Sequence, residues 1–205
     1  RNGQMGAGVR VSIDYPPGED ARPTRLAFSP DASQLAYASG VPNAFRGFVH
    51  VVDTSVFPIV PNSAQRVRTD GTADGAIDNL YYSDDSQRLA FSRFTATATR
   101  ADVCVIDTAS VSQAALVGEG ATPLSDRQIS PWRPASQELL ALQNEELVVV
   151  DTSSLGTPST RSLSAPNPGQ ILAAGFTQSA TPAWFVAADN GTGGIFVNDA
   201  LQGGT

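Results

Sequence analysis

The sequence predicts an all-β protein built from four successive repeats of about 50 residues. Residues 26–37, LAFSPDASQLAY, align with residues 80–91, LYYSDDSQRLAF, at an offset of 80 − 26 = 54. Residues 49–54, VHVVDT, align with residues 103–108, VCVIDT, at the same offset, 103 − 49 = 54. These segments are rich in β-branched and aromatic residues and lack an apolar stripe with helical period. Both properties favour strands.

Two further copies are more diverged. In the third, residues 132–142 and 148–152 take the places of the two segments, and in the fourth, residues 175–177, 183–187 and 195–199 do so. Units of this length are typical of β-propeller blades, each a four-stranded antiparallel sheet. We therefore predict a single propeller domain over residues 1–205. Its predicted blades cover approximately residues 24–69, 78–118, 128–164 and 170–205.

Each unit divides into four strand-sized pieces. The first ends in an aromatic residue, and a tight polar turn follows it because Pro and Asp favour turns. A return strand and a Val-rich third strand closed by Asp-Thr come next. The predicted fourth strands are residues 65–69, 114–117 and 160–163. The aromatic residues that end the first strands are Phe28, Tyr82, Trp132 and Phe176.

The N-terminal segment, residues 8–14, resembles one of these fourth strands but precedes the first unit. We predict that it completes the last blade, which would close a four-blade ring and remove its exposed edges. The alternative is a four-blade segment of a larger propeller. The sequence leaves both arrangements open.

Composition excludes several classes of protein. All 13 basic residues are Arg, the net charge is −7, and no window concentrates the positive charge that nucleic-acid binding needs. No apolar stretch is long enough for a membrane helix, so we expect no membrane insertion. One His and one Cys are too few ligands for a closed zinc site. We expect no cofactor.

The residues at 68–75, RTDGTADG, at 80–92 and at 103–107 resemble the repeat of TolB-like propellers, which are WD-repeat-like in architecture. Residues 26–31 resemble it too. The turn glycine of that repeat is replaced here by Ala32 and Ser86. The resemblance implies a propeller fold and a bacterial periplasmic or extracellular location. The α/β domain that precedes the propeller of TolB is absent from these residues, so the resemblance is to the repeat and not to TolB itself.

Several residues invite a site. Asp70, Asp74 and Asp78 form a weak calcium candidate, although their spacing is not that of an EF-hand. His50 takes the position that Cys104 has in the next unit, which favours packing over catalysis, and no Gly-x-Ser-x-Gly elbow is present. We therefore expect no enzyme activity. The Asp residues that close the third strands are expected to bond the following turn: Asp53, Asp107, Asp151 and Asp199.

The loops after the second strands are uneven. In the first two units they carry aromatic and Arg residues, which are common in protein interfaces, whereas the last two units have shorter polar loops. We predict a non-catalytic interaction or scaffolding module of the bacterial cell envelope. The alternatives are a structural subunit of a larger assembly and the propeller part of an exported peptidase-like enzyme. The predicted protein-binding residues are Phe45, Arg46, Arg93, Phe94 and Arg100.

Overall fold

The computed structural model describes most of the repeat region. No helix occurs among the described residues, and none of them could therefore form a membrane-spanning helix. The all-β prediction is confirmed. The described ranges are 22–40, 47–61, 63–69, 75–94, 101–111, 113–118, 121–123, 130–143, 146–163, 170–176, 183–189 and 192–198.

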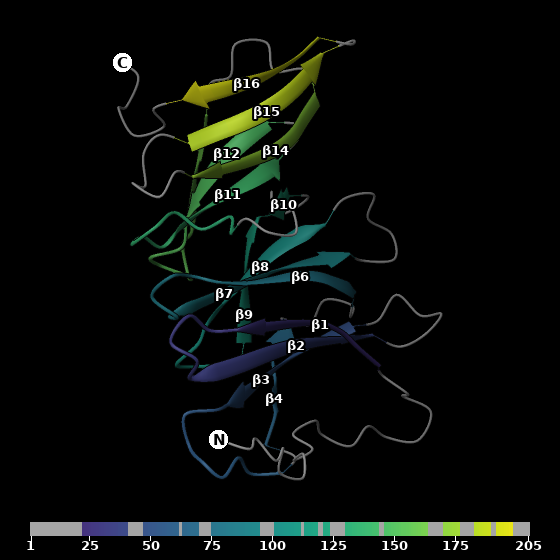
Figure 1. Ribbon diagram of the computed structural model, residues 1–205, viewed down its shortest axis with the longest axis vertical. Coiled ribbons are helices and arrows are strands. Elements are labelled where there is room, and N and C mark those ends of the chain that lie inside the picture. Colours follow the sequence, from purple (N-terminus) through teal and green to yellow (C-terminus); the bar gives the residue numbers. More distant parts are fainter. Residues whose placement is uncertain are drawn as a thin grey trace, which may run out of the picture.

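The described strands form four sheets, which we call blades one to four (Figure 1). Blade one contains β1 (Arg22–Phe28), β2 (Gln34–Gly40), β3 (Gly47–Asp53) and β4 (Gln65–Arg66). Blade two contains β6 (Ala76–Tyr82), β7 (Arg88–Phe94), β8 (Asp102–Asp107) and β9 (Gln113–Gly118), with β5 (Arg68–Thr69) added at its edge. Blade three contains β10 (Ala121–Pro123), β11 (Glu138–Gln143), β12 (Glu146–Asp151) and β13 (Ser159–Ser162). Blade four contains β14 (Gln170–Phe176), β15 (Ala183–Asp189) and β16 (Thr192–Asn198).

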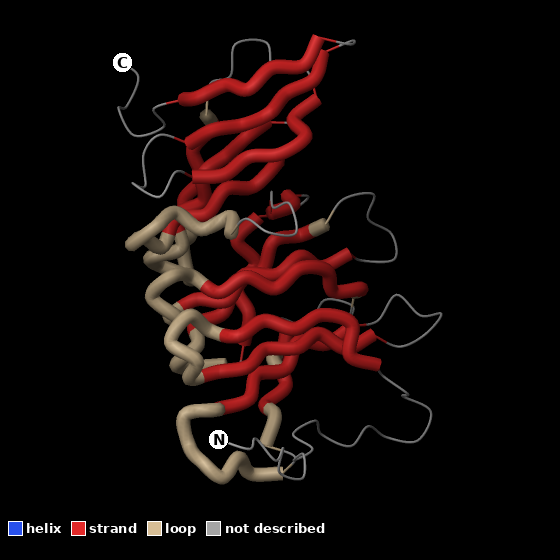
Figure 2. Tube along the Cα trace, in the orientation of Figure 1, coloured by secondary structure: helices blue, strands red, loops and turns tan. Residues whose placement is uncertain are grey.

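The blades follow one another along the long axis of the molecule. Blade one lies at one end, in purple and blue, and blade four at the other, in yellow (Figure 1). The tube view shows the strands of successive blades layered in the same order (Figure 2). The described blades therefore form an open segment of a propeller, not a closed four-blade ring. Residues 8–14, predicted to complete blade four, lie outside the described residues.

The repeat determines the register of the first hairpin in every blade. The predicted aromatic residues pair with equivalent partners on the return strand: Phe28 with Leu35, Tyr82 with Leu89, Trp132 with Leu139 and Phe176 with Ala183. A one-residue slip would send every side chain of a strand to the other face of its sheet. The shared register therefore keeps the same positions on the same face of every blade.

The first hairpin is closed by the same turn in blades one to three. In blade one the Ser29 N–H donates to the Gln34 carbonyl, and the Ala32 N–H donates to the Ser29 carbonyl. Ala32 adopts a φ of 58° and the equivalent Ser86 a φ of 61°. In blade three the residue before the equivalent position, Ala135, has a φ of 53°. This left-handed region disfavours residues other than glycine. Because no glycine occupies these turns, the backbone is strained at the residues with positive φ.

Ala32→Gly is expected to raise the free energy of unfolding by about 0.5–1 kcal/mol. A left-handed conformation costs an L-residue about 1–2 kcal/mol, and the greater freedom of glycine in the unfolded chain offsets about 0.5–1 kcal/mol of that gain. Urea unfolding followed by circular dichroism measures the change.

Ser86→Gly is the matched control for Ala32→Gly. It relieves the same strain but removes the Ser86 Oγ that accepts a hydrogen bond from the Asp31 N–H at 3.2 Å across blades one and two. We expect a smaller gain or none. A loss of stability in Ala32→Gly would contradict this account of the turn.

The Asp-Thr pair at the end of the third strand ties each blade to its first turn. The Asp53 carboxylate accepts from the Ser55 N–H at 2.8 Å, and Asp107 and Asp151 bond their own turns in the same way. The following hydroxyl reaches back to the hairpin turn: Thr54 Oγ1 donates to the Ala32 carbonyl at 2.8 Å. Thr108 makes the equivalent bond to the Ser86 carbonyl, and Thr152 donates to the Gln137 carbonyl, one residue later in the turn of blade three. The prediction for Asp53, Asp107 and Asp151 is confirmed, and Asp199 lies outside the described residues.

Two elements differ from the prediction. The predicted fourth strand of blade one, residues 65–69, is divided: β4 pairs with β3, whereas β5 pairs in parallel with β9 of blade two. The chain crosses to the next blade here, and the edge of β9 offers unpaired backbone groups to it.

In blade three the innermost strand is β10, and Trp132 contributes a single bridge to Leu139. Blade three therefore begins at Ala121, before the predicted residue 128.

The hydrophobic core lies between neighbouring blades. One cluster joins blades one and two, and includes Val49, Val51, Leu80, Leu89 and Phe91. A second joins blades two and three, and includes Val103, Val105, Trp132, Leu139 and Val150. The blades therefore hold one another by face-to-face burial, as expected for repeats that cannot bury both faces alone.

Candidate interaction surfaces of blades one and two

The loops after the second strands differ in length as predicted. β2 and β3 pair up to Gly40 and Gly47, which leaves residues 41–46 to connect them. β7 and β8 are connected by residues 95–101. In blades three and four, residues 144–145 and 190–191 alone make the equivalent connections. Blades one and two therefore carry the two longer loops.

Glycines allow unusually close packing where these loops begin and end. A Cβ atom on Gly47 would lie 2.9 Å from the Gly75 carbonyl oxygen and 2.9 Å from the Ile77 nitrogen. A Cβ on Gly75 would lie 2.4 Å from the carbonyl oxygen of Phe94. These neighbours are backbone atoms, which cannot move aside as a flexible side chain does. Three strand ends from two blades are therefore held in direct backbone contact.

The predicted binding residues fall into two groups. Arg93 is buried, 4% exposed, and its Nη2 donates to Asp102 Oδ2 at 2.9 Å across the β7–β8 ladder. This position assigns Arg93 to the support of the blade and not to an exposed contact surface. Phe94 is half-buried at the end of β7. Phe45, Arg46 and Arg100 lie outside the described residues.

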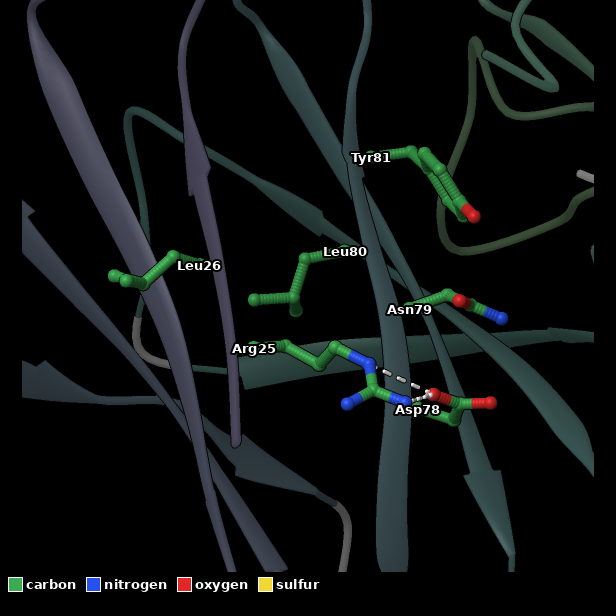
Figure 3. Close-up of a pocket in the computed structure, with 6 residues that line it drawn as sticks. All are labelled: Arg25, Leu26, Asp78, Asn79, Leu80 and Tyr81. Carbon is green, nitrogen blue, oxygen red and sulfur yellow. Dashed lines mark hydrogen bonds and ion pairs between the residues drawn. The ribbon is translucent and has the colours of Figure 1, made fainter. Parts of the chain in front are cut away.

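A pocket of about 460 Å³ opens between the inner strands of blades one and two. Arg25 of β1 points toward Asp78 of β6 (Figure 3), and Arg25 Nε donates to Asp78 Oδ1 at 3.1 Å. Arg25 pairs with Ala38 and Asp78 with Ser92, and these two partners are equivalent positions of the repeat, since 38 + 54 = 92. The remaining lining residues are Leu26, Asn79, Leu80 and Tyr81. An ion pair between Arg25 and Asp78 thus joins the inner strands of the two blades.

Only one residue of the weak calcium candidate is described. The Asp78 carboxylate is engaged with Arg25 at 2.8 Å, while Asp70 and Asp74 lie outside the described residues. Within the part of the chain that the structure describes, no group of three or more His, Cys, Asp or Glu side chains could hold a metal ion.

His50 and Ser39 are close but enclosed. Ser39 Oγ lies 3.2 Å from His50 Nε2, which is within reach for a nucleophile and its base. His50 is fully buried and Ser39 nearly so, and His50 stacks on Tyr37 at 4.7 Å between ring centroids. Burial, with a smaller contribution from the charge of Arg66, lowers the pKa of His50 to about 4. This enclosure supports the predicted packing role, which Cys104, also buried, shares in blade two.

An exposed apolar surface at the far end of blade one has no counterpart in the sequence prediction. Leu26 and Phe28 of β1 are 67% and 65% exposed. The segment after β3 adds exposed Val56, Phe57 and Val60 at the same end of the molecule (Figure 1). The sequence identified Phe28 only as the aromatic residue that ends the first strand of its unit.

Solved structures show what the chain is similar to. A protein assigned as TolB from Agrobacterium tumefaciens matches 86% of this chain and 58% of its own length, with a TM-score of 0.53 and 13% sequence identity. The chain has the β-propeller fold. A dipeptidyl aminopeptidase IV assigned in Bacteroides ovatus matches 87% of this propeller and 32% of its own length, with a TM-score of 0.56 and 11% identity. No family model and no curated protein matches.

These similarities establish the fold of the propeller and nothing finer. A prolyl endopeptidase matches 87% of this chain and 33% of its own length, with a TM-score of 0.53 and 12% identity. The propeller thus spans less than two thirds of each of these proteins. The predicted TolB-like propeller is confirmed as a fold, and the low identity agrees with a relation to the repeat and not to TolB itself.

Proposed function

We propose that this propeller segment binds a protein partner in the bacterial cell envelope, without catalysis, through the loops of blades one and two. The paired long loops, which start and end at the contact of Gly47, Gly75 and Phe94, are the observation that carries the proposal. A rigid base lowers the conformational entropy that a loop loses on binding. Phe and Arg residues then offer apolar area and charged hydrogen bonds to the partner.

The contact residues in this proposal are Phe45, Arg46, Phe94 and Arg100. Arg93 is left out because Asp102 already holds its buried guanidinium. Each of the two loops carries one positive charge, Arg46 or Arg100, and no negative charge, although the whole chain has a net charge of −7. An acidic patch on the partner would therefore fit these loops.

The test replaces the four contact residues with Ala in one variant. Wild type and variant are immobilised as bait in an envelope extract, and captured proteins are quantified by mass spectrometry. The affinity of the best-captured protein is then measured with purified components. We expect a loss of at least about tenfold and an unchanged melting temperature. Equal capture by both baits would contradict the proposal.

A control variant with exposed residues changed at the opposite, turn end of the blades, Ser110→Ala with Ser153→Ala, should capture as much as wild type. Both residues are exposed and lie after the third strands of blades two and three. Loss of capture in the control as well would mean that the loops act only through general surface properties.

The second candidate function is the propeller part of an exported peptidase-like enzyme. It is supported by the peptidases among the similar structures, of which this chain spans about a third. In that arrangement catalysis belongs to another domain that lies outside these residues. The complete reading frame distinguishes the two: a hydrolase domain encoded beside the propeller would favour the enzyme.

A further inference from the structure

Asn79 adopts a left-handed backbone conformation inside a strand. Its φ is 57°, and it lies within β6 (Ala76–Tyr82). The other residues with positive φ that are not glycine, within the part of the chain that the structure describes, lie in the turns of the first hairpins: Ala32, Ser86 and Ala135. This conformation is unfavourable for an L-residue, and no hairpin turn requires it at Asn79. Strain of this kind is common at functional sites.

The left-handed residue belongs to a β-bulge in the inner strand of blade two. The pairing of β6 with β7 shifts register between Asp78 and Leu80, so Asn79 is the extra residue without a partner on β7. A bulge sets two residues against one on the partner strand and re-aims their side chains. Figure 3 shows Asn79 between Tyr81 and Asp78, with its amide pointing to the same side as the Tyr81 ring. The bulge therefore gathers an amide, a carboxylate and an aromatic ring on one short stretch of β6.

These three side chains line the pocket of about 460 Å³ between blades one and two. Arg25 engages one oxygen of Asp78: Oδ1 lies 3.1 Å from Nε and 2.8 Å from Nη2. Among the described residues, none forms a hydrogen bond with Asp78 Oδ2 or with the side-chain amide of Asn79. Arg25 thus fixes the carboxylate by one oxygen and leaves the other available. The pocket offers a ligand one charged acceptor and one amide that both donates and accepts.

The chemistry of the pocket fits a neutral ligand with hydroxyl groups. The charges of Arg25 and Asp78 are in contact and largely cancel, so a charged ligand gains little net attraction. A hydroxyl group both donates and accepts, so neighbouring hydroxyls can donate to Asp78 Oδ2 and accept from the Asn79 amide. The negative face of an aromatic ring such as Tyr81 attracts weakly positive C–H groups. A sugar ring combines these features, since it carries hydroxyls at its edge and C–H groups on its face.

We propose that this pocket binds a neutral saccharide. Asp78 Oδ2 and the Asn79 amide bond its hydroxyl groups, Tyr81 contacts the C–H face of the ring, and Arg25 acts as a positioning residue for the carboxylate. The volume of the pocket falls within the usual range for small ligands, about 300–1,000 Å³, and suits a mono- or disaccharide. The site lies on β1 and β6, so it is separate from the loops of the proposed function.

Saturation-transfer NMR of the 205-residue chain with small-molecule probes tests the proposal. The neutral probes are glucose, N-acetylglucosamine and maltose, and the charged comparisons are free glycine and putrescine. Isothermal titration calorimetry then measures the affinity of the saccharide with the strongest signal. We expect a Kd of about 1 mM, because few hydrogen bonds hold the ligand. The absence of a signal from all three saccharides, or stronger binding of a charged probe, overturns the proposal.

Asn79→Gly is the most informative variant, because glycine adopts the left-handed conformation without strain. It removes the amide but keeps the bulge, so the melting temperature should not fall while the saccharide affinity drops about tenfold. Asp78→Ala should lower the affinity at least as much, since it removes the charged acceptor. Arg161→Ala is the matched control: it breaks an exposed ion pair with Glu138, at 3.1 Å, outside the pocket. This control should bind the saccharide as wild type does.

The variants also locate any binding that the probes reveal. Unchanged affinity in Asn79→Gly overturns the proposal, and so does a loss in Arg161→Ala as large as that in the pocket variants. The four-alanine loop variant should bind the saccharide as wild type does, and the pocket variants should still capture the protein partner of the loops. Failure of the loop function and failure of this proposal are therefore distinguishable.

Discussion

Trp132→Ala is expected to lower the free energy of unfolding by about 3–5 kcal/mol, the usual result of removing a large buried aromatic side chain. Trp132 is 2% exposed within the cluster that joins blades two and three. Its Nε1–H also donates to the Tyr81 carbonyl at 2.8 Å, so the same side chain supplies both apolar burial and a hydrogen bond to the neighbouring blade. Urea unfolding followed by fluorescence and circular dichroism measures the loss.

Trp132→Phe separates the two contributions. It keeps an aromatic ring in the interface but leaves the Tyr81 carbonyl without this donor, which should cost about 1–2 kcal/mol. Phe57→Ala is the surface control: Phe57 is 90% exposed, and its replacement should change stability by less than about 0.5 kcal/mol. A loss in Trp132→Ala no larger than that control would show that the junction of blades two and three does not depend on this residue.

Acidification from pH 7 to pH 5 is expected to lower the free energy of unfolding by about 2 kcal/mol through His50 alone. The pKa of His50 is lowered to about 4 in the folded protein, whereas an unfolded histidine has a pKa of about 6.5. The unfolded chain therefore takes up the proton first. The stability is fully present above about pH 6.5 and is lost as the pH falls toward 4.

His50→Phe should remove this slope, because the ring can still stack on Tyr37 but has no titrating group. Two other groups do not interfere: hydrogen bonds from Ser29 and Ser33 lower the pKa of Asp31 to about 2, and bonds from Ser55 lower that of Asp53. The stabilisation that these two carboxylates contribute is lost only as the pH falls below about 3.9, the ordinary pKa of an Asp carboxyl. It therefore does not change between pH 7 and pH 5. Equal slopes for wild type and variant between pH 7 and 5 would rule out His50 as the cause. Since the chain has a single histidine, its proton resonance gives the pKa directly.

Local repetition made the blades predictable. The offset of 54 placed Phe28 and Tyr82 at equivalent strand ends, and both pair with the Leu that follows the turn. The Asp-Thr pair was likewise readable, because its hydrogen bonds join residues within one turn or one hairpin. In both cases the contacts join residues that are close in sequence, and the same residue types recur in successive units.

Elements determined by distant neighbours were not predictable in this way. β5 and β10 have only two and three residues, too few to show a period, and β5 pairs with a strand more than 40 residues away in sequence, since 113 − 68 = 45. Leu26 and Leu80 occupy the same repeat position, so no local pattern distinguishes the exposed one from the buried one. Arg93 was interpreted as a contact residue, although its cross-strand partner Asp102 could have been found from the hairpin register.

The crossing segment at β5 has a mechanical consequence. Blades one and two are joined at their inner edges by Arg25 and Asp78, across their faces by the core, and at the outer edge by β5 on β9. Because contacts join the two blades at the inner edge, across the face and at the outer edge, we expect blades one and two to move together as one rigid unit. A bending force on blades one and two would then have to break all three kinds of contact at once, so the strand ends that carry the two long loops would keep their spacing.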